Sequence, residues 1–138
     1  MKTIAVIDGQ GGGIGSFIIK SLREHFGESI EIIALGTNST ATSAMLKARA
    51  NKGATGENAI IWNAPRVDII TGPLSIVLAN SMLGELTARM SEAISSSPAK
   101  RILLSLNQEH VDIVGAEKEP LPHLIEKLVS KIREECNV

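Results

Sequence analysis

The feature that most constrains the fold of this chain is a glycine-rich loop between a short apolar run and a helical pattern. Residues 3–8 form a nearly continuous apolar run, which is typical of a strand covered on both faces. Five glycines follow within residues 9–15, and apolar side chains then recur at helical spacing as far as Phe26. A strand, a glycine loop and a helix in this order predict the first strand-to-helix unit of an α/β protein.

The rest of the chain alternates between apolar runs and helical patterns. The runs predict strands at residues 29–35, 67–71, 101–106 and 111–115, and the patterns predict helices at residues 39–50, 57–64, 74–97 and 120–132. Thr55 is a candidate cap for the second of these helices, and Thr87 is a candidate cap where the third one breaks. Because the loop 107–110 is too short for a helical crossover, the strands on either side of it should pair as an antiparallel hairpin.

These elements predict one Rossmann-like domain over residues 1–138. We expect a three-layer α/β fold whose mainly parallel sheet has about five strands, in the order 2-1-3-4-5 and with strand 5 antiparallel. In this order, strands 1 and 3 flank the topological switch point, where open α/β sheets bind their ligands. Gly9–Gly13 after the first strand, and Thr71, Gly72 and Pro73 at the end of the third, should therefore form two walls of one crevice.

The glycine loop has the composition of an anion-binding site. Residues Gly9, Gln10, Gly11, Gly12, Gly13, Ile14 and Gly15 lead directly into the predicted helix. Glycines carry no Cβ that would hold an anion away from the backbone, and the free N–H groups and dipole of a helix N-terminus favour a phosphate. The alternative is a tight turn that binds nothing, although five glycines are more than such a turn needs.

The spacing of the glycines narrows the class of ligand. A strict G-x-G-x-x-G pattern does not fit, and no lysine follows the glycines, which excludes a P-loop. The spacing Gly9-x-x-x-Gly13-x-Gly15 resembles the cofactor loop of short-chain dehydrogenases, with Asp8 in the position of their threonine. The chain contains no tyrosine, so the Tyr-x-x-x-Lys chemistry of those enzymes is excluded.

The end of the second predicted strand bears on the choice of a nucleotide cofactor. Dinucleotide sites usually place an acid about 20 residues after the glycines, where it holds the ribose hydroxyls. Here Thr37, Asn38 and Ser39 occupy that place without an acid, which favours NADP, although Lys47 and Arg49 lie late on the next helix. The three polar residues could bind the cofactor or cap the helix.

Few residues are candidates for catalysis. Asp8 and Glu57 are the acid–base candidates, yet Asp8 could equally hold the loop N–H groups and Glu57 could stabilise a helix start. Asn58 and Asn80 are further polar candidates, with a satisfied buried amide as the alternative for Asn80. The three histidines lie far apart and there is a single cysteine, so no metal site is predicted.

Composition and charge bear on the partners. The net charge of -1 and the aromatic content of 2% argue against a nucleic-acid partner. The longest charge-free run, residues 69–84, is short and interrupted by polar residues, so we expect no membrane span and a cytoplasmic protein. A helix in this run would be buried on every side, which predicts a homo-oligomer.

Six segments together resemble a small family of bacterial proteins that is catalogued as a domain of unknown function. These segments are residues 6–15, 34–38, 41–48, 53–60, 80–85 and 120–125. The resemblance covers nearly the whole chain. It implies a bacterial, cytosolic, single-domain protein with a Rossmann-like start, but it implies no activity.

The sequence leaves three hypotheses for the function. In the first, the chain binds a nucleotide, with NAD(P) favoured among dinucleotides, or another phosphorylated small molecule at the glycine loop. In the second, it is a small enzyme that acts on a phosphorylated or carboxylated metabolite, with Asp8 or Glu57 as the acid–base group. In the third, it is a non-catalytic, homo-oligomeric regulatory or assembly protein whose glycines serve only the turn.

Overall fold

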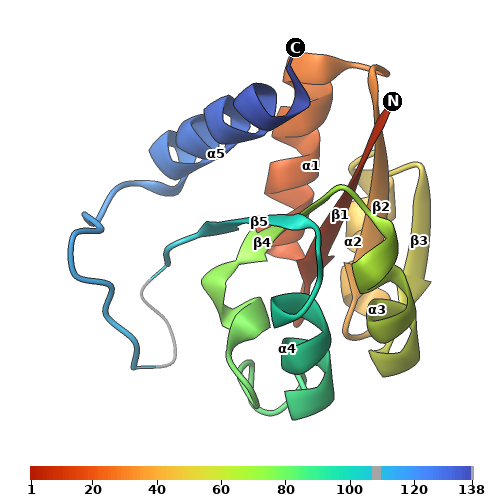
Figure 1. The fold of residues 1–138 in the computed structure, drawn as a ribbon, viewed down its shortest axis with the longest axis vertical. Coiled ribbons are helices and arrows are strands. Elements are labelled where there is room, and N and C mark those ends of the chain that lie inside the picture. Colours follow the sequence, from red (N-terminus) through yellow and green to blue (C-terminus); the bar gives the residue numbers. More distant parts are fainter. Residues whose placement is uncertain (107–109, 138) are drawn as a thin grey trace.

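A computed structural model of the chain, which describes residues 1–106 and 110–137, shows an α/β fold with helices on both faces of one sheet (Figure 1). The strands are β1 (Lys2–Asp8), β2 (Ile30–Gly36), β3 (Lys52–Thr55), β4 (Ile69–Pro73) and β5 (Lys100–Leu104). The helices are α1 (Gly13–Phe26), α2 (Ser39–Lys47), α3 (Glu57–Asn63), α4 (Ala88–Ser95) and α5 (Leu121–Cys136), with short 3-10 turns η1 (Ala64–Arg66) and η2 (Leu74–Val77). The predicted fold class is therefore confirmed.

The sheet order is β3-β2-β1-β4-β5, and every neighbouring pair of strands is parallel. The predicted order of the first four strands is confirmed, since these are β2, β1, β4 and β5. The prediction of a fifth, antiparallel strand at residues 111–115 was wrong, because these residues form an irregular segment and a turn. The missing edge strand is β3, which lies beside β2 at the opposite edge and makes Thr55 the end of a strand rather than a helix cap.

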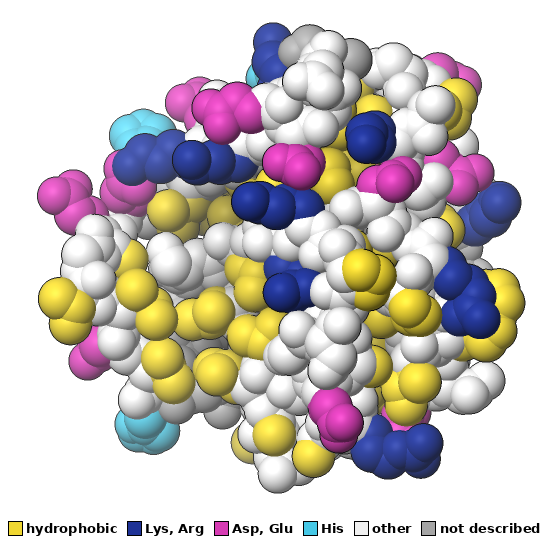
Figure 2. All heavy atoms as spheres, viewed as in Figure 1, with side chains coloured by type: hydrophobic (Ala, Val, Ile, Leu, Met, Phe, Trp, Pro, Cys, Tyr) yellow, Lys and Arg dark blue, Asp and Glu magenta, His cyan; other side chains and the backbone are white. Residues whose placement is uncertain are grey.

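Two features explain these errors. The β3 strand reads Lys-Gly-Ala-Thr and is largely exposed, so it lacks the apolar alternation by which a strand is recognised. In the segment 111–115, Val114 is fully exposed and Ile113 is 45% exposed, so apolar composition did not mean a buried strand. Figure 2 shows hydrophobic side chains gathered on the face where the chain passes from β5 toward α5.

The predicted helix at residues 74–97 is mostly absent. Its first part is η2 followed by turns, in which Asn80, Met82 and Leu83 have left-handed φ angles between 57° and 66°. Only α4 is an α-helix, and Thr87 caps it as predicted, with its hydroxyl accepting the Met90 N–H at 3.1 Å. Residues 69–84, the charge-free run that predicted an oligomer, are therefore largely β4, η2 and turns and not a helix buried on every side. The homo-oligomer stays a prediction, but this run no longer supports it.

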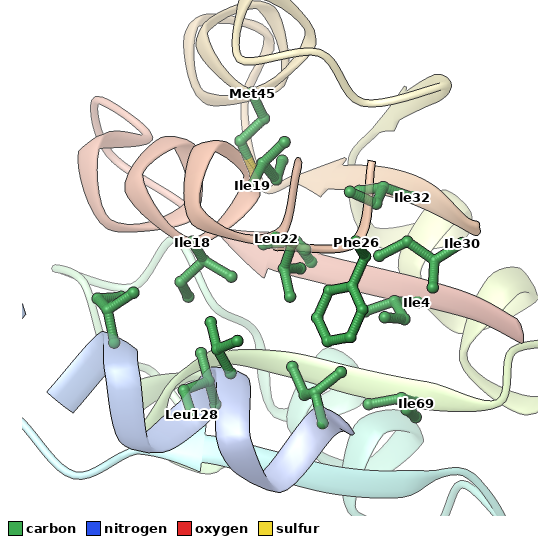
Figure 3. Close-up of a cluster of buried hydrophobic side chains, with 14 of the residues drawn as sticks. Ile4, Ile18, Ile19, Leu22, Phe26, Ile30, Ile32, Met45, Ile69 and Leu128 are labelled. Carbon is green, nitrogen blue, oxygen red and sulfur yellow. The ribbon is translucent and has the colours of Figure 1, made fainter. Parts of the chain in front are cut away.

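Alternating side chains of the central strands pack into two hydrophobic cores. Ile4 and Val6 of β1 face a core covered by α1, α2 and α5, whereas Ala5 and Ile7 face a core covered by α3 and α4. Figure 3 shows Ile18 and Leu22 of α1 pointing into the first core together with Leu128 of α5. Each such side chain contributes about 1.5–3 kcal/mol when fully buried. Helix α1 is thus held by the sheet and α5, which fixes its N-terminus at the carboxyl edge of β1.

In the described part of the chain, no helix is both long enough and apolar enough to cross a membrane.

Candidate functional site

The glycine loop follows β1 at the carboxyl edge of the sheet, and Asp8 holds its backbone in place. The buried Asp8 carboxylate accepts the Gly9 N–H at 2.8 Å through Oδ1 and the Gly15 N–H at 2.7 Å through Oδ2. Burial, with a smaller effect of the nearby Glu85 charge, raises the pKa of Asp8, although the Gly15 and Gly9 N–H groups act against this shift. Both oxygens of Asp8 are therefore used to shape the loop.

Close packing explains why some positions of the loop must be glycine, whereas other loop glycines have free space around them. A Cβ on Gly9 would lie 2.5 Å from Thr37 Oγ1, and Gly12 has a φ of +74° with the Ala41 backbone 2.8 Å from where its Cβ would be. By contrast, nothing lies within 4 Å of a Cβ placed on Gly11 or Gly13. Among the described residues, no hydrogen bond is made by the N–H of Gly11 or Gly13. These two glycines leave space for a ligand that the fold itself does not fill.

A second carboxylate, that of Glu85, is bound by the loop and by the end of β2. Glu85 Oε1 accepts three bonds: from the Gln10 N–H at 2.8 Å, the Thr37 hydroxyl at 2.7 Å and the Asn38 side-chain amide at 2.8 Å. We call these three donors the anion cradle. The Gln10 N–H lowers the pKa of Glu85 most, and the Thr37 and Asn38 donors lower it further. The cradle thus favours a bound negative charge.

The side chains of the cradle are fixed by their own neighbours. Asn38 Oδ1 accepts the Ala41 N–H at 2.8 Å and so caps α2, while its amide nitrogen also donates to the Gln10 carbonyl at 3.0 Å. The Thr37 N–H donates to the Asp8 carbonyl at 3.0 Å, which joins the end of β2 to the end of β1. The predicted residues Gln10, Thr37 and Asn38 are therefore brought together, while Ser39 is exposed at the start of α2.

The predicted second wall, formed by Thr71, Gly72 and Pro73, is buried within β4. A Cβ on Gly72 would lie 2.3 Å from the Ile7 carbonyl oxygen, so the wall packs tightly against β1. The loop face of Gly9 is covered instead by Met82 and Glu85, whose nearest atoms would lie 2.6 and 3.1 Å from a Cβ at Gly9. Both residues come from the turns that follow β4, and they lie where the crevice was predicted.

The comparisons with known proteins agree with the resemblance found in the sequence. The family model of the domain of unknown function DUF3842 matches residues 3–137. The chain belongs to this family. No curated protein sequence matches it. Among solved structures, it is similar to a dodecameric FMN-dependent UbiX-like decarboxylase from Escherichia coli O157:H7, with 14% identity over 100% of this chain and 95% of that chain, at a TM-score of 0.45.

Glu57, Asn58 and Asn80 lie outside the cradle of this DUF3842 chain. The Glu57 carboxylate joins α3 to α4, since it accepts the Thr87 hydroxyl at 2.6 Å and pairs with Arg89 at 3.3 Å. Asn58 is exposed. Asn80 is exposed in a turn, where its N–H donates to the Leu86 carbonyl, so the alternative interpretation as a buried amide was wrong.

Sequence reasoning missed Glu85, the residue that completes the cradle. Its bond to Gln10 spans 75 residues, and nothing in a local pattern could have placed the two together. Within residues 1–106 and 110–137, no group of three or more His, Cys, Asp and Glu side chains is positioned to hold a metal ion. What the site offers chemically is a set of fixed neutral donors around one anionic group.

Proposed function

We propose that this chain binds a nucleotide or another phosphorylated small molecule at the glycine loop, where a phosphate oxygen takes the donors that Glu85 now occupies. The observation that carries the proposal is the anion cradle. A backbone N–H, a hydroxyl and a side-chain amide converge on a single anionic oxygen at 2.7–2.8 Å, which is the geometry that a phosphate oxygen requires.

Phosphate binding at the cradle requires that Glu85 leave. A phosphate beside the charged Glu85 would be repelled by about 1 kcal/mol at 4 Å in water, and by more where water is excluded. The segment that carries Glu85 is suited to this movement, because Met82 and Leu83 adopt left-handed φ angles that are unfavourable for their side chains. Leu83 is 97% exposed, whereas Met82 and Leu86 are buried, so the movement is confined to the turn between these two anchored side chains.

The surroundings of the cradle support a nucleotide as the phosphorylated ligand. Gly11 and Gly13 leave open space beside the loop, which allows a bulky ligand to approach the backbone. Thr37–Ser39 follow β2, where dinucleotide folds hold the adenosine ribose, and none of the three is an acid, so a 2′-phosphate meets no carboxylate there once Glu85 has left Thr37 and Asn38. Among dinucleotides we therefore favour NAD(P), with NADP ahead of NAD.

A binding role is better supported than acid–base catalysis by the two carboxylates predicted for it. Both oxygens of Asp8 accept N–H groups of the loop, and Glu57 is paired with Thr87 and Arg89. Neither carboxylate is positioned with a free oxygen toward the cradle. The proposed function is therefore ligand binding, and no reaction is assigned.

The test is a thermal-shift screen against NAD, NADP, FAD, ATP, GTP and sugar phosphates, followed by calorimetry of any ligand that shifts the midpoint. A ligand at 100 times its Kd adds about 2.7 kcal/mol to the free energy of unfolding. The variant Asn38→Ala removes one donor of the cradle together with the cap of α2, and it should reduce the shift. Asn58→Ala, an exposed asparagine on α3, is the matched control and should bind as the unaltered chain does.

Two results would contradict this proposal. One is the absence of a shift with every ligand in the screen, which would favour the regulatory or assembly hypothesis. The other is a shift that Asn38→Ala retains in full, since binding would then occur without the cradle.

A further inference from the structure

A groove with a volume of about 640 Å³ runs along the surface between α1 and the end of α2. Gly13, Phe17 and Lys20 line it from α1, and Lys47 and Arg49 line it from the end of α2 and the residues that follow. A volume of this size is within the range of small-molecule sites, about 300–1,000 Å³. The groove is therefore large enough to hold a ligand of nucleotide size.

The groove concentrates positive charge in a chain whose net charge is -1. Lys20, Lys47 and Arg49 are all exposed, and in the described part of the chain none of their charged groups makes an ion pair or a hydrogen bond. Glu24 is the acidic residue among those that line the groove. The cations therefore outnumber the carboxylates in this concave surface, and such an excess of positive charge raises the local concentration of anions.

The floor of the groove is rigid because a buried arginine ties its two sides together. Arg23 of α1 donates to the Arg49 carbonyl at 2.8 Å through Nε, and its other nitrogens donate to the Gly27 carbonyl at 2.9 Å and to Asn51 Oδ1 at 2.5 Å. These bonds fix the segment that carries Lys47 and Arg49 beside α1. The groove is therefore formed before any ligand arrives, which lowers the cost of binding.

Phe17 adds an aromatic surface to this cationic groove. Its side chain lies on α1 with 38% of its surface exposed, one helical turn from Lys20. An exposed aromatic ring is suited to stack on a planar ring of a ligand. The groove thus combines an aromatic platform with several unpaired cations.

We propose that this groove is a second binding site, which takes a small molecule carrying both an aromatic ring and a phosphate group. The phosphate dianion pairs with Lys20, Lys47 and Arg49, and the ring lies against Phe17. The site does not rest on the proposed function: it shares Gly13 with the open side of the glycine loop, but it uses none of the three donors of the anion cradle. It also needs no movement of Glu85.

The probe for this site is 1-naphthyl phosphate, measured by calorimetry and by its fluorescence. 1-Naphthol tests the ring without the charge, and inorganic phosphate tests the charge without the ring. We expect binding of the naphthyl phosphate that exceeds both and that weakens with added salt. The loss of one charged partner, in Lys20→Gln or in Lys47→Gln, should weaken binding by about tenfold.

Lys100→Gln is the matched control, because it removes the same charge from an exposed position on the edge strand β5. This control should bind as the unaltered chain does. Phe17→Leu should reduce the advantage of naphthyl phosphate over inorganic phosphate without changing the affinity for inorganic phosphate. NMR shifts on titration should map to Gly13, Phe17 and Lys47.

The two sites are separated by the variant Asn38→Ala, which removes a donor of the cradle and should leave the affinity for naphthyl phosphate unchanged. The inference is overturned if the unaltered chain does not bind the probe, or if the double variant Lys20→Gln, Lys47→Gln binds it undiminished. It is equally overturned if Lys100→Gln weakens binding as much as the groove variants do, or if Asn38→Ala abolishes it. This last outcome would assign the probe to the cradle and support the proposed function alone.

Discussion

Two regions of this chain beside α1 are suited to bind negative charge. They differ in whether a carboxylate of the chain itself already occupies them. At the glycine loop, the donors of the backbone and of the cradle are held by the chain's own carboxylates, Asp8 and Glu85. In the α1–α2 groove, Lys20 and Lys47 have no ion-pair partner among the described residues. The loop therefore uses its polar groups for stability, whereas the groove holds polar groups that folding does not use.

This difference shows why a glycine-rich loop is an ambiguous sign of ligand binding. The same N–H groups that suit a phosphate also suit an internal carboxylate, and each internal bond contributes to the folded state. Unpaired cations in a concave surface carry the opposite meaning, since they stabilise nothing in the chain alone. The following substitutions test whether the loop residues stabilise the folded state and the groove cations do not. They are given from the largest expected effect to the smallest.

The largest expected effect on the free energy of unfolding comes from replacing Gly12, a packed glycine of the loop. The open glycine Gly13 of the same loop is the comparison. Gly12→Val places a Cβ against the Ala41 backbone at 2.8 Å in a residue with a φ of +74°. We expect it to lower the free energy of unfolding by about 3 kcal/mol or more. A Cβ on Gly13 meets nothing within 4 Å, so Gly13→Val should change this free energy by less than about 1 kcal/mol. Urea denaturation of the two variants measures both values.

The Gly13→Val variant has a second use, because we expect it to fold as the unaltered chain does while it fills the open side of the loop. It should lose the phosphorylated ligand of the cradle in the thermal-shift screen. Equal losses of stability in the two variants would show that the loop is packed throughout, and that its open glycines leave no room for a ligand.

Asp8→Asn should have the next largest effect on stability. Asparagine has the same shape but only one acceptor oxygen, so one of the N–H groups of Gly9 and Gly15 is left buried without an acceptor. We expect the free energy of unfolding to fall by about 2 kcal/mol. Asp112→Asn, at an exposed position between β5 and α5, is the control and should have no measurable effect. A loss no larger than that of the control would mean that Asp8 does not hold the loop.

Glu85→Gln should have a smaller effect that depends on pH. The cradle lowers the pKa of Glu85 below its ordinary value of 4.5, so the carboxylate stabilises the folded state above that pH, and this contribution is lost as the pH falls through the lowered pKa. We expect a cost of about 1 kcal/mol at pH 7. The difference between the variant and the unaltered chain should shrink in acid.

Chemical denaturation at a series of pH values measures this difference, with Glu126→Gln on the exposed face of α5 as the control. The same variant weakens the internal competitor for the cradle, so it should bind the phosphorylated ligand more tightly. A difference in stability that is constant with pH would mean that the cradle does not recognise the charge of Glu85.

The sequence was informative where one local pattern decides the structure. β1, α1 and β2 were placed because a continuous apolar run and a helical period are strong signals over six or more residues. The same pattern failed for β3, whose exposed residues Lys52–Thr55 carry no apolar period, and for the turns around Met82, whose apolar composition imitates a helix.

The candidate site was only partly predictable for a related reason. Gln10, Thr37 and Asn38 were found because each follows a strand, and the ends of neighbouring parallel strands meet at one edge of the sheet. Glu85 follows no strand directly and reaches the cradle from a turn whose backbone angles the sequence does not reveal. Lys20, Lys47 and Arg49 were visible as charges, but their common groove depends on how α1 packs on α2.

The smallest expected effect is a gain in stability when a groove cation is removed. Lys47 lines the groove on the same side as Arg49 and opposite Lys20, and it makes no ion pair among the described residues, so Lys47→Gln relieves repulsion and should raise the free energy of unfolding by about 0.3 kcal/mol at low salt. The gain should disappear in 1 M NaCl, where the screening length is about 3 Å. Urea denaturation at the two salt concentrations measures it, with Lys100→Gln as the control. A loss of stability at low salt would mean that Lys47 has a partner within the chain, and the groove would then resemble the loop, with its charge already used by the fold.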